Sequence, residues 1–213
     1  MKPGKKVFIP FLVLAGLLLL GINGCVTSPQ PPPKTDYYTL EYDPIATDLQ
    51  GPVQSIIRVE RFQVAPYYNT TNIIYKETSF KINAYHYHKW RANPGDLVTY
   101  FLARDLRESG LFNGVFILSS KYPASHIIDG TLDRFYQQTI DNSWQAVLSV
   151  NITFMADYEP DISKRILFQK EYTFKKQCVQ KNPRALAEAM SLAMAEISKA
   201  IIKDIHHSLT KRR

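Results

Sequence analysis

The residues that could do chemistry are few in this chain of 213 residues. His86 and His88 would share one face of a strand, where their imidazoles could form half of a zinc site or simply lie half-buried. A zinc site needs a third and usually a fourth ligand, and nothing in the sequence connects the candidate His126 to this pair. Asp129 and Asp133 would likewise share a face, as a carboxylate pair or as surface charge. Because G-x-S-x-G, Walker A and G-x-G-x-x-G motifs are absent, we predict no catalytic residue, metal or cofactor.

The N-terminal segment has the pattern of an export signal. The first six residues carry three lysines and no acid, and a mostly apolar run extends from Val7 to Ile22. A membrane-spanning helix needs about 20 apolar residues, so this run is short for a span. A basic start, a short apolar stretch and small residues at its end are typical of a secretory signal peptide. We therefore predict a signal peptide over residues 1–24, with an uncleaved anchor helix as the alternative.

Cys25 directly follows this segment, and Ile22-Asn23-Gly24-Cys25 resembles the bacterial lipobox, although Ile22 and Asn23 replace commoner residues. The resemblance implies that the Cys25 thiol receives a diacylglycerol, that the chain is cut before it, and that the new amino group is acylated. Two or three acyl chains on one residue give stable membrane attachment. Val26, rather than Asp, comes next, which by resemblance to Gram-negative lipoproteins favours the periplasmic face of the outer membrane.

The composition of the chain after the signal peptide limits its organisation and its partners. Four prolines between residues 29 and 33 predict an extended linker over residues 25–36. The remaining chain is long enough for one domain with a core, which we place at residues 37–209, before a basic tail at 210–213. Without residues 1–24 the charge falls to about +4 (26 − 3 = 23 basic and 19 acidic residues), which does not call for a nucleic-acid partner. Cys178 would be the one remaining thiol, so the fold cannot depend on an internal disulfide; we expect it to be partly buried and unreactive.

Hydrophobic periodicity predicts an α+β fold. Alternation is clearest from Trp144 to Tyr158, where every second residue is apolar, and this strand pairs naturally with its neighbours on both sides as a meander. Asp96 is a plausible N-cap for a helix that ends at Gly110, and Asn182 opens a last helix with one apolar stripe. Further strands are expected at residues 37–42, 56–66, 72–90 (a hairpin) and 115–120. The expected architecture is an antiparallel or mixed β-sheet packed on one side by two amphipathic α-helices.

Aromatic residues concentrate around the first hairpin. The chain has 13 tyrosines, and tyrosine is favoured where one end of a side chain is dry and the other is wet. Alternation places Phe80, His86, His88 and Trp90 on one strand face and Tyr85 and Tyr87 on the other. The cluster predicts either a binding surface, for protein or acyl chains, or ordinary edge-strand tyrosines. The candidate partner-binding residues are Tyr67, Tyr68, Tyr75, Tyr85, Tyr87 and Trp90.

The same region resembles the ABC-type transport auxiliary lipoproteins, a family that includes the paraquat-inducible C-type lipoproteins. The likeness covers most of residues 37–205 and is strongest over residues 56–115. Family features include a strand ending in Val-x-x-Pro, a Tyr-rich turn, a (V/I)-Y-(R/K) strand, a Y-x-x-W strand and an S-G-L-F-x-x-V segment after a helix. They correspond here to Val64-Ala65-Pro66 (one residue shorter than the family spacing), Tyr67-Tyr68, Ile74-Tyr75-Lys76, Tyr87-His88-Lys89-Trp90 and Ser109 to Val115. The turn after Tyr68 departs from the family pattern, because Asn69-Thr70-Thr71-Asn72 stands where Asp-Arg is common.

The resemblance implies a role in transport without chemistry of its own. Relatives are outer-membrane partners of transporters that combine an ABC ATPase and permease with a periplasmic MCE-type substrate-binding protein, and that move lipids or other hydrophobic compounds. The expected role is docking of the MCE protein to the outer membrane, either singly or as a homo-oligomer, with the membrane held through the lipid anchor. The alternatives are an assembly lipoprotein of another envelope machine, a periplasmic carrier that holds lipid in its own cavity, and a hydrolase with an unrecognised site.

Overall fold

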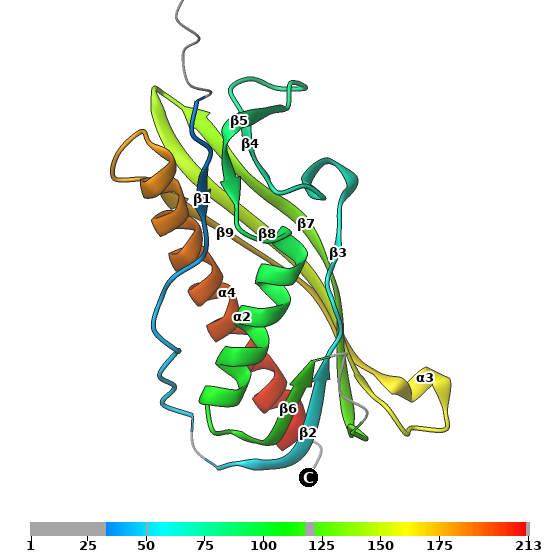
Figure 1. Ribbon diagram of the computed structural model, residues 1–213. Coiled ribbons are helices and arrows are strands. Elements are labelled where there is room, and N and C mark those ends of the chain that lie inside the picture. Colours follow the sequence, from blue (N-terminus) through cyan, green and yellow to red (C-terminus); the bar gives the residue numbers. More distant parts are fainter. Residues whose placement is uncertain (1–32, 50, 118–121, 212–213) are drawn as a thin grey trace, which may run out of the picture. The chain divides into compact units, whose positions relative to one another are not determined.

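A computed structural model of the protein describes residues 33–49, 51–117 and 122–211 (Figure 1). The chain divides into two compact units, Met1–Pro33 and Lys34–Arg213, and the second unit carries the fold. The predicted signal peptide, Cys25 and most of the predicted linker lie outside the described residues.

The second unit is built from one mixed β-sheet and three described α-helices. The helices are α2 (Pro94–Glu108), α3 (Ile162–Arg165) and α4 (Pro183–Thr210), with a 3-10 turn η1 (Pro66–Tyr68). The strands are β1 (Asp36–Tyr38), β2 (Val53–Val59), β3 (Gln63–Val64), β4 (Asn72–Lys76), β5 (Asn83–Trp90), β6 (Phe112–Ile117), β7 (His126–Ile140), β8 (Ser143–Ala156) and β9 (Ile166–Gln177). The predicted α+β class with a mixed sheet is therefore confirmed.

Strand β7 organises the sheet because it is long enough to pair with several partners. Along one edge it pairs with β8, antiparallel, over nearly its whole length. Along the other edge it pairs in turn with β2, β3 and β4, all parallel to it. A β-bulge between Leu132 and Arg134 bends the strand, and the sheet curls around the helices (Figure 1).

The predicted meander of three long strands is confirmed as β7, β8 and β9. Asp141 and Asn142 connect β7 to β8 with φ angles of 45° and 59°, the left-handed pair that a two-residue hairpin turn requires. On the inner face of β8, alternate side chains from Ala146 to Phe154 are fully buried. Tyr158, the last residue of the predicted strand, lies beyond its end and is exposed.

Both long helices pack on the same face of the sheet, as predicted (Figure 1). Helix α4 presents to the sheet the apolar stripe that the sequence indicates, which includes Leu186, Met190 and Ile197. Its N-cap is Asn182, whose side chain accepts a hydrogen bond from the amide of Ala185 at 2.8 Å.

The N-cap predicted for α2 is wrong by three residues. The cap is Asn93, whose side-chain oxygen accepts from the amide of Gly95 at 3.0 Å, and Pro94 occupies the first turn. Asp96 lies inside the first turn, where its carboxylate suits the positive end of the helix dipole and pairs with Arg61. The predicted end of the helix at Gly110 is confirmed, because α2 ends at Glu108 and Gly110 has the left-handed φ of 66° that is common just after a helix.

Two predicted strands are shorter than their sequence pattern indicates. The first covers Asp36–Tyr38 and does not reach residue 42. The second, predicted over residues 56–66, is interrupted between β2 and β3, because the Phe62 ring is fully buried and its amide donates to Thr99 Oγ1 at 2.9 Å instead of to a neighbouring strand. The alternation of residues 56–66 does not reveal this interruption, because Thr99, which holds the backbone of Phe62, lies far along the chain.

The predicted hairpin of residues 72–90 forms, but its side-chain alternation is broken. The pairing of β4 with β5 shifts register between Asn72 and Ile74, so β5 holds extra residues opposite β4. As a result Tyr85 and His88, predicted on opposite faces, have ring centroids 5.8 Å apart. Phe80, predicted on a strand, lies in the hairpin connection with a φ of 64° and is fully exposed.

Candidate functional site

The histidines considered as a metal site are not brought together. His88 Nδ1 lies 3.4 Å from the Tyr38 hydroxyl and 3.9 Å from Asp36 Oδ2, while His86 is exposed beside Tyr87. His126 lies at the start of β7, in a separate polar cluster. Within the described ranges, no group of three or more His, Cys, Asp or Glu side chains is placed to hold a metal ion.

The cluster around His126 has the residue types of a nucleophile and its base. The Oγ atoms of Ser55 and Ser125 both lie 2.9 Å from His126 Nδ1, and the His126 ring stacks on Phe154. Ser125 Oγ also donates to the carbonyl of Ile56 and accepts from its amide. Ser55 is buried, and the half-buried Ser125 hydroxyl is already engaged by the backbone of Ile56. The cluster therefore serves to join the start of β7 to β2.

A buried carboxylate is a second feature that often marks an active site. Asp105 on α2 is fully buried, and it accepts a hydrogen bond from the Tyr42 hydroxyl at 2.7 Å and two more from Arg104. Burial and this contact with Asp105 raise the pKa of Tyr42 well above its usual value. Arg104 also donates to the carbonyl of Tyr42 and lies 4.3 Å from its ring centroid. These contacts hold the segment after β1 against α2, so Asp105 has a structural role.

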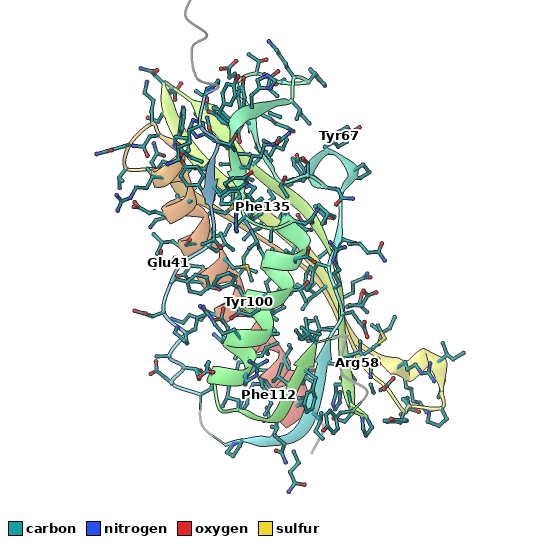
Figure 2. All side chains as sticks on the ribbon, viewed as in Figure 1. Glu41, Arg58, Tyr67, Tyr100, Phe112 and Phe135 are labelled. Atoms are coloured by element: carbon teal, nitrogen blue, oxygen red, sulfur yellow. The ribbon has the colours of Figure 1, made fainter. Side chains whose placement is uncertain are left out.

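The six candidate partner-binding residues divide into three groups by exposure. Tyr67 and Tyr87 are 68% and 49% exposed, and Figure 2 shows Tyr67 projecting from the η1 turn. Tyr75 and Tyr85 are half-buried. Tyr68 and Trp90 are only 5% and 1% exposed. The last two cannot present a contact surface, and this part of the sequence prediction needs correction.

The two buried aromatics are held by ring packing in the core. Tyr68 stacks on Tyr136 with ring centroids 5.6 Å apart. Trp90 meets Phe135 edge-to-face at 5.0 Å, and Phe135 lies between the sheet and the helices (Figure 2). In this chain the tryptophan of the Y-x-x-W pattern therefore anchors β5 in the core and does not contribute to a contact surface.

The half-buried tyrosines Tyr75 and Tyr85 belong to a packed aromatic cluster. The rings of Tyr75 and Tyr85 lie 4.6 Å apart, and Trp144 lies 6.3 Å from Tyr85. The Tyr85 hydroxyl donates to Gln137 Oε1 at 2.8 Å. Burial raises the pKa of Tyr85 to about 12, so the phenol stays neutral and keeps its proton for this hydrogen bond. Such a cluster holds the β4–β5 hairpin in one position against β7.

Sequence reasoning missed several exposed apolar side chains in the connections. Phe80, Val179 and Ile140 lie respectively in the β4–β5 connection, in the β9–α4 connection and at the end of β7. The polar run Glu77-Thr78-Ser79 before Phe80 could have indicated a turn there. Val179 and Ile140 gave no such signal, because single exposed apolar residues are common on protein surfaces.

Comparison with solved structures identifies the class of fold. A protein from Xanthomonas campestris superposes with a TM-score of 0.76 at 13% identity, over 84% of this chain and 98% of that one. A second structure, of an uncharacterised protein, gives a TM-score of 0.64 at 12% identity, over 81% of this chain and 99% of that one. At these identities the likeness establishes a shared fold. No curated protein matches the chain significantly.

The family is established by sequence. Residues 38–202 match the model of the family described as ABC-type transport auxiliary lipoprotein component, and the chain belongs to that family. The match covers every described strand and helix except the ends of β1 and α4. The family description specifies a lipoprotein and an accessory role in ABC-type transport, and it specifies no enzymatic activity. In the described part of the chain, no helix is long and apolar enough to cross a membrane.

Proposed function

We propose that the protein is a lipid-anchored docking subunit on the periplasmic face of the outer membrane, where it holds the MCE-domain protein of an ABC-type transport system. The match to transport auxiliary lipoproteins over residues 38–202 is the observation that carries this proposal. Acyl chains on Cys25 would supply the attachment to the membrane. The transported compound would be a lipid or another hydrophobic molecule, and ATP would be hydrolysed by another chain.

The proposed contact surface is the outer part of the β4–β5 hairpin and the neighbouring η1 turn. Tyr67 and Tyr87 are the exposed members, and the packed pair Tyr75 and Tyr85 stiffens the hairpin. Tyrosine contributes much contact area for the loss of few rotatable bonds. A hairpin fixed by the Tyr85–Gln137 hydrogen bond loses little further freedom when a partner binds. Several identical subunits arranged as a ring would multiply such contacts around one MCE protein.

A lipid carrier is less well supported by the packing. The side chains between the helices and the sheet, such as Met190, Leu148 and Phe154, are fully buried and belong to one continuous hydrophobic core. A depression of about 600 Å³ lies at the surface beside the β4–β5 connection and is lined mainly by polar residues from Lys76 to Ser79. An acyl chain held in water needs apolar walls, which this depression does not provide.

The test is recovery of partners from the native envelope. Full-length tagged protein would be extracted in mild detergent, and the bound proteins and lipids would be identified. We expect an MCE-domain protein together with its permease and ATPase. Recovery of a stoichiometric lipid without these subunits would instead establish the carrier, and recovery of another envelope assembly would establish a different accessory role.

Matched tyrosine variants then test the contact surface. We expect Tyr87→Ser and Tyr67→Ser each to weaken partner binding by about tenfold, since an interfacial tyrosine commonly contributes about 1–2 kcal/mol. Tyr100→Ser is the control, because Tyr100 is 58% exposed but lies on α2 (Figure 2). Equal binding by all three variants would place the contact elsewhere on the protein.

A further inference from the structure

Four segments of the second unit meet at one end of the sheet. The β4–β5 connection lies beside the end of β7, because Lys76 is paired with Gln138. The β9–α4 connection lies against the β7–β8 turn, because Lys181 Nζ donates to Asn142 Oδ1 at 2.7 Å. The chain also enters the unit at this end, where β1 runs beside β5 (Figure 1).

Three of these segments expose apolar side chains to solvent. Phe80 is fully exposed, Val179 is 84% exposed and Ile140 is 44% exposed. Phe80 also has a left-handed backbone conformation, which is costly for a residue with a large side chain. These exposed side chains do not stabilise the fold, because an apolar side chain contributes hydrophobic free energy only when it is removed from water. Exposed apolar side chains also occur at the opposite end, at Ile162 and Ile166, so exposure alone does not distinguish the two ends, and the choice depends on where the anchored chain enters the unit.

Cationic side chains outnumber acidic ones at this end of the unit. The lysines and arginine at this end are Lys34, Lys76, Lys81, Lys176, Lys181 and Arg184, and the acids are Asp36, Glu77, Asp141 and Glu188. The cations exceed the acids, and Arg184 is already paired with Glu188. Lysine can lay its apolar stem along a hydrocarbon surface while its ammonium group stays with phosphate headgroups. Apolar side chains among an excess of cations suit the interfacial region of a bilayer.

The short length of the chain between Cys25 and the second unit favours a membrane over other partners for this end of the unit. Cys25 and Lys34 are nine residues apart, so the chain between them spans at most about 30 Å. An anchor in the bilayer would therefore keep this end of the unit within that distance of the lipid headgroups. Short tethers give effective concentrations in the millimolar range, at which even a weak contact of a few side chains is occupied.

We propose that this end, defined by Phe80, Ile140 and Val179 with the neighbouring lysines, is a membrane-contacting surface that reaches the boundary between the headgroups and the acyl chains of the bilayer holding the lipid anchor. The inference rests on the proposed lipidation of Cys25 and is independent of the MCE partner. It adds an orientation to the proposed function. The opposite end, with α3, lies roughly 40 Å away along the 14-residue strand β8, and it would face away from the membrane.

The experiment uses lipidated full-length protein in vesicles of phosphatidylethanolamine and phosphatidylglycerol, with or without brominated acyl chains. Phe80→Trp places a fluorophore on the proposed surface, and Val179→Trp places a second one on another segment. Ile162→Trp is the matched control, because Ile162 is 78% exposed but lies on α3 at the opposite end. Emission of the unmodified protein, which contains Trp90 and Trp144, is subtracted from each variant.

We expect brominated lipid to reduce the added emission of Phe80→Trp and Val179→Trp about twofold and to leave Ile162→Trp unchanged, since quenching requires entry into the acyl boundary. Equal quenching at both ends, or none at Phe80→Trp and Val179→Trp, would overturn the proposal. A different result would be no quenching in vesicles together with a blue shift of the tryptophan emission that appears only when the envelope partner is added. That result would assign this end of the unit to a protein contact instead. Failure of the protein to float with the vesicles would overturn the lipid anchor as well, whereas flotation without quenching would overturn only the membrane contact.

Discussion

At the scale of single residues, environment decides what each reactive group can do. Cys178 lies just after β9, is buried, and donates its amide to the carbonyl of Trp144 at 2.8 Å. Burial raises the pKa of its thiol to about 11 from an ordinary value of 9.0. Because the thiolate is the nucleophile, both the low thiolate fraction and the lack of access make this cysteine unreactive.

Alkylation measures this directly. At pH 8 we expect N-ethylmaleimide to modify Cys178 at least about 100-fold more slowly in the folded protein than after unfolding in guanidinium, since burial suppresses both ionisation and access. The rate in the folded protein should rise with pH up to about 11, because the neutral thiol ionises only there. Ser79→Cys, at an exposed position of the β4–β5 connection, is the positive control and should react at once. A Cys178 rate equal to that of the control would show that the segment after β9 opens readily.

At the scale of elements, the sequence predicted regular strands and helices better than irregular ones. Strand β8 and helix α4 were predictable because each buries one continuous face, which fixes a period in the sequence. The bulged strand β5 was not, because one register shift exchanges the two faces for every residue beyond it. The burial of Tyr68 and Trp90 depends on Tyr136 and Phe135, which come from β7 and leave no local mark on the sequence.

The packing of the Phe62 ring against β7 is another such long-range feature, and it requires the glycine at position 130. A Cβ atom at Gly130 would lie 2.6 Å from Phe62 Cε1 and 3.0 Å from the carbonyl oxygen of Asn151. Both contacts are too close, and neither the buried ring nor the backbone of β8 can easily move. Gly130 therefore makes room for the Phe62 ring where β2 gives way to β3.

We expect Gly130→Ala to lower the free energy of unfolding by about 1–3 kcal/mol, the usual cost of overpacking a core. Urea denaturation measures the loss. Gly114→Ala is the control, since its nearest contact is the movable Phe116 side chain at 3.3 Å, and it should cost less. Adding Phe62→Leu to Gly130→Ala should restore part of the stability, because the smaller side chain removes the clash. Strict additivity of the two changes would contradict the packing argument.

At the scale of the whole second unit, one core joins all the long elements. Residues from Leu40 to Ile205 form a single hydrophobic cluster that includes side chains of the hairpin, the meander and both long helices. The proposed membrane end and the proposed partner surface are both built on the β4–β5 hairpin, whose stem is fixed to β7 by Tyr85 and Gln137. A docking subunit with this arrangement would transmit the position of the membrane to its partner through a rigid body and not through a flexible joint.

Such a body should unfold in one cooperative step. Trp90 reports on the hairpin through its contact with Phe135, and Trp144 reports on the start of β8. We expect tryptophan emission and far-ultraviolet circular dichroism to give the same urea midpoint, because no element can lose its packing without exposing the shared core. In Trp144→Phe, where Trp90 alone reports, the two signals should still coincide. A Trp90 transition at lower urea than the circular dichroism would mean that the hairpin opens separately. The two proposed surfaces would then move relative to the helices, and docking would occur through a hinge.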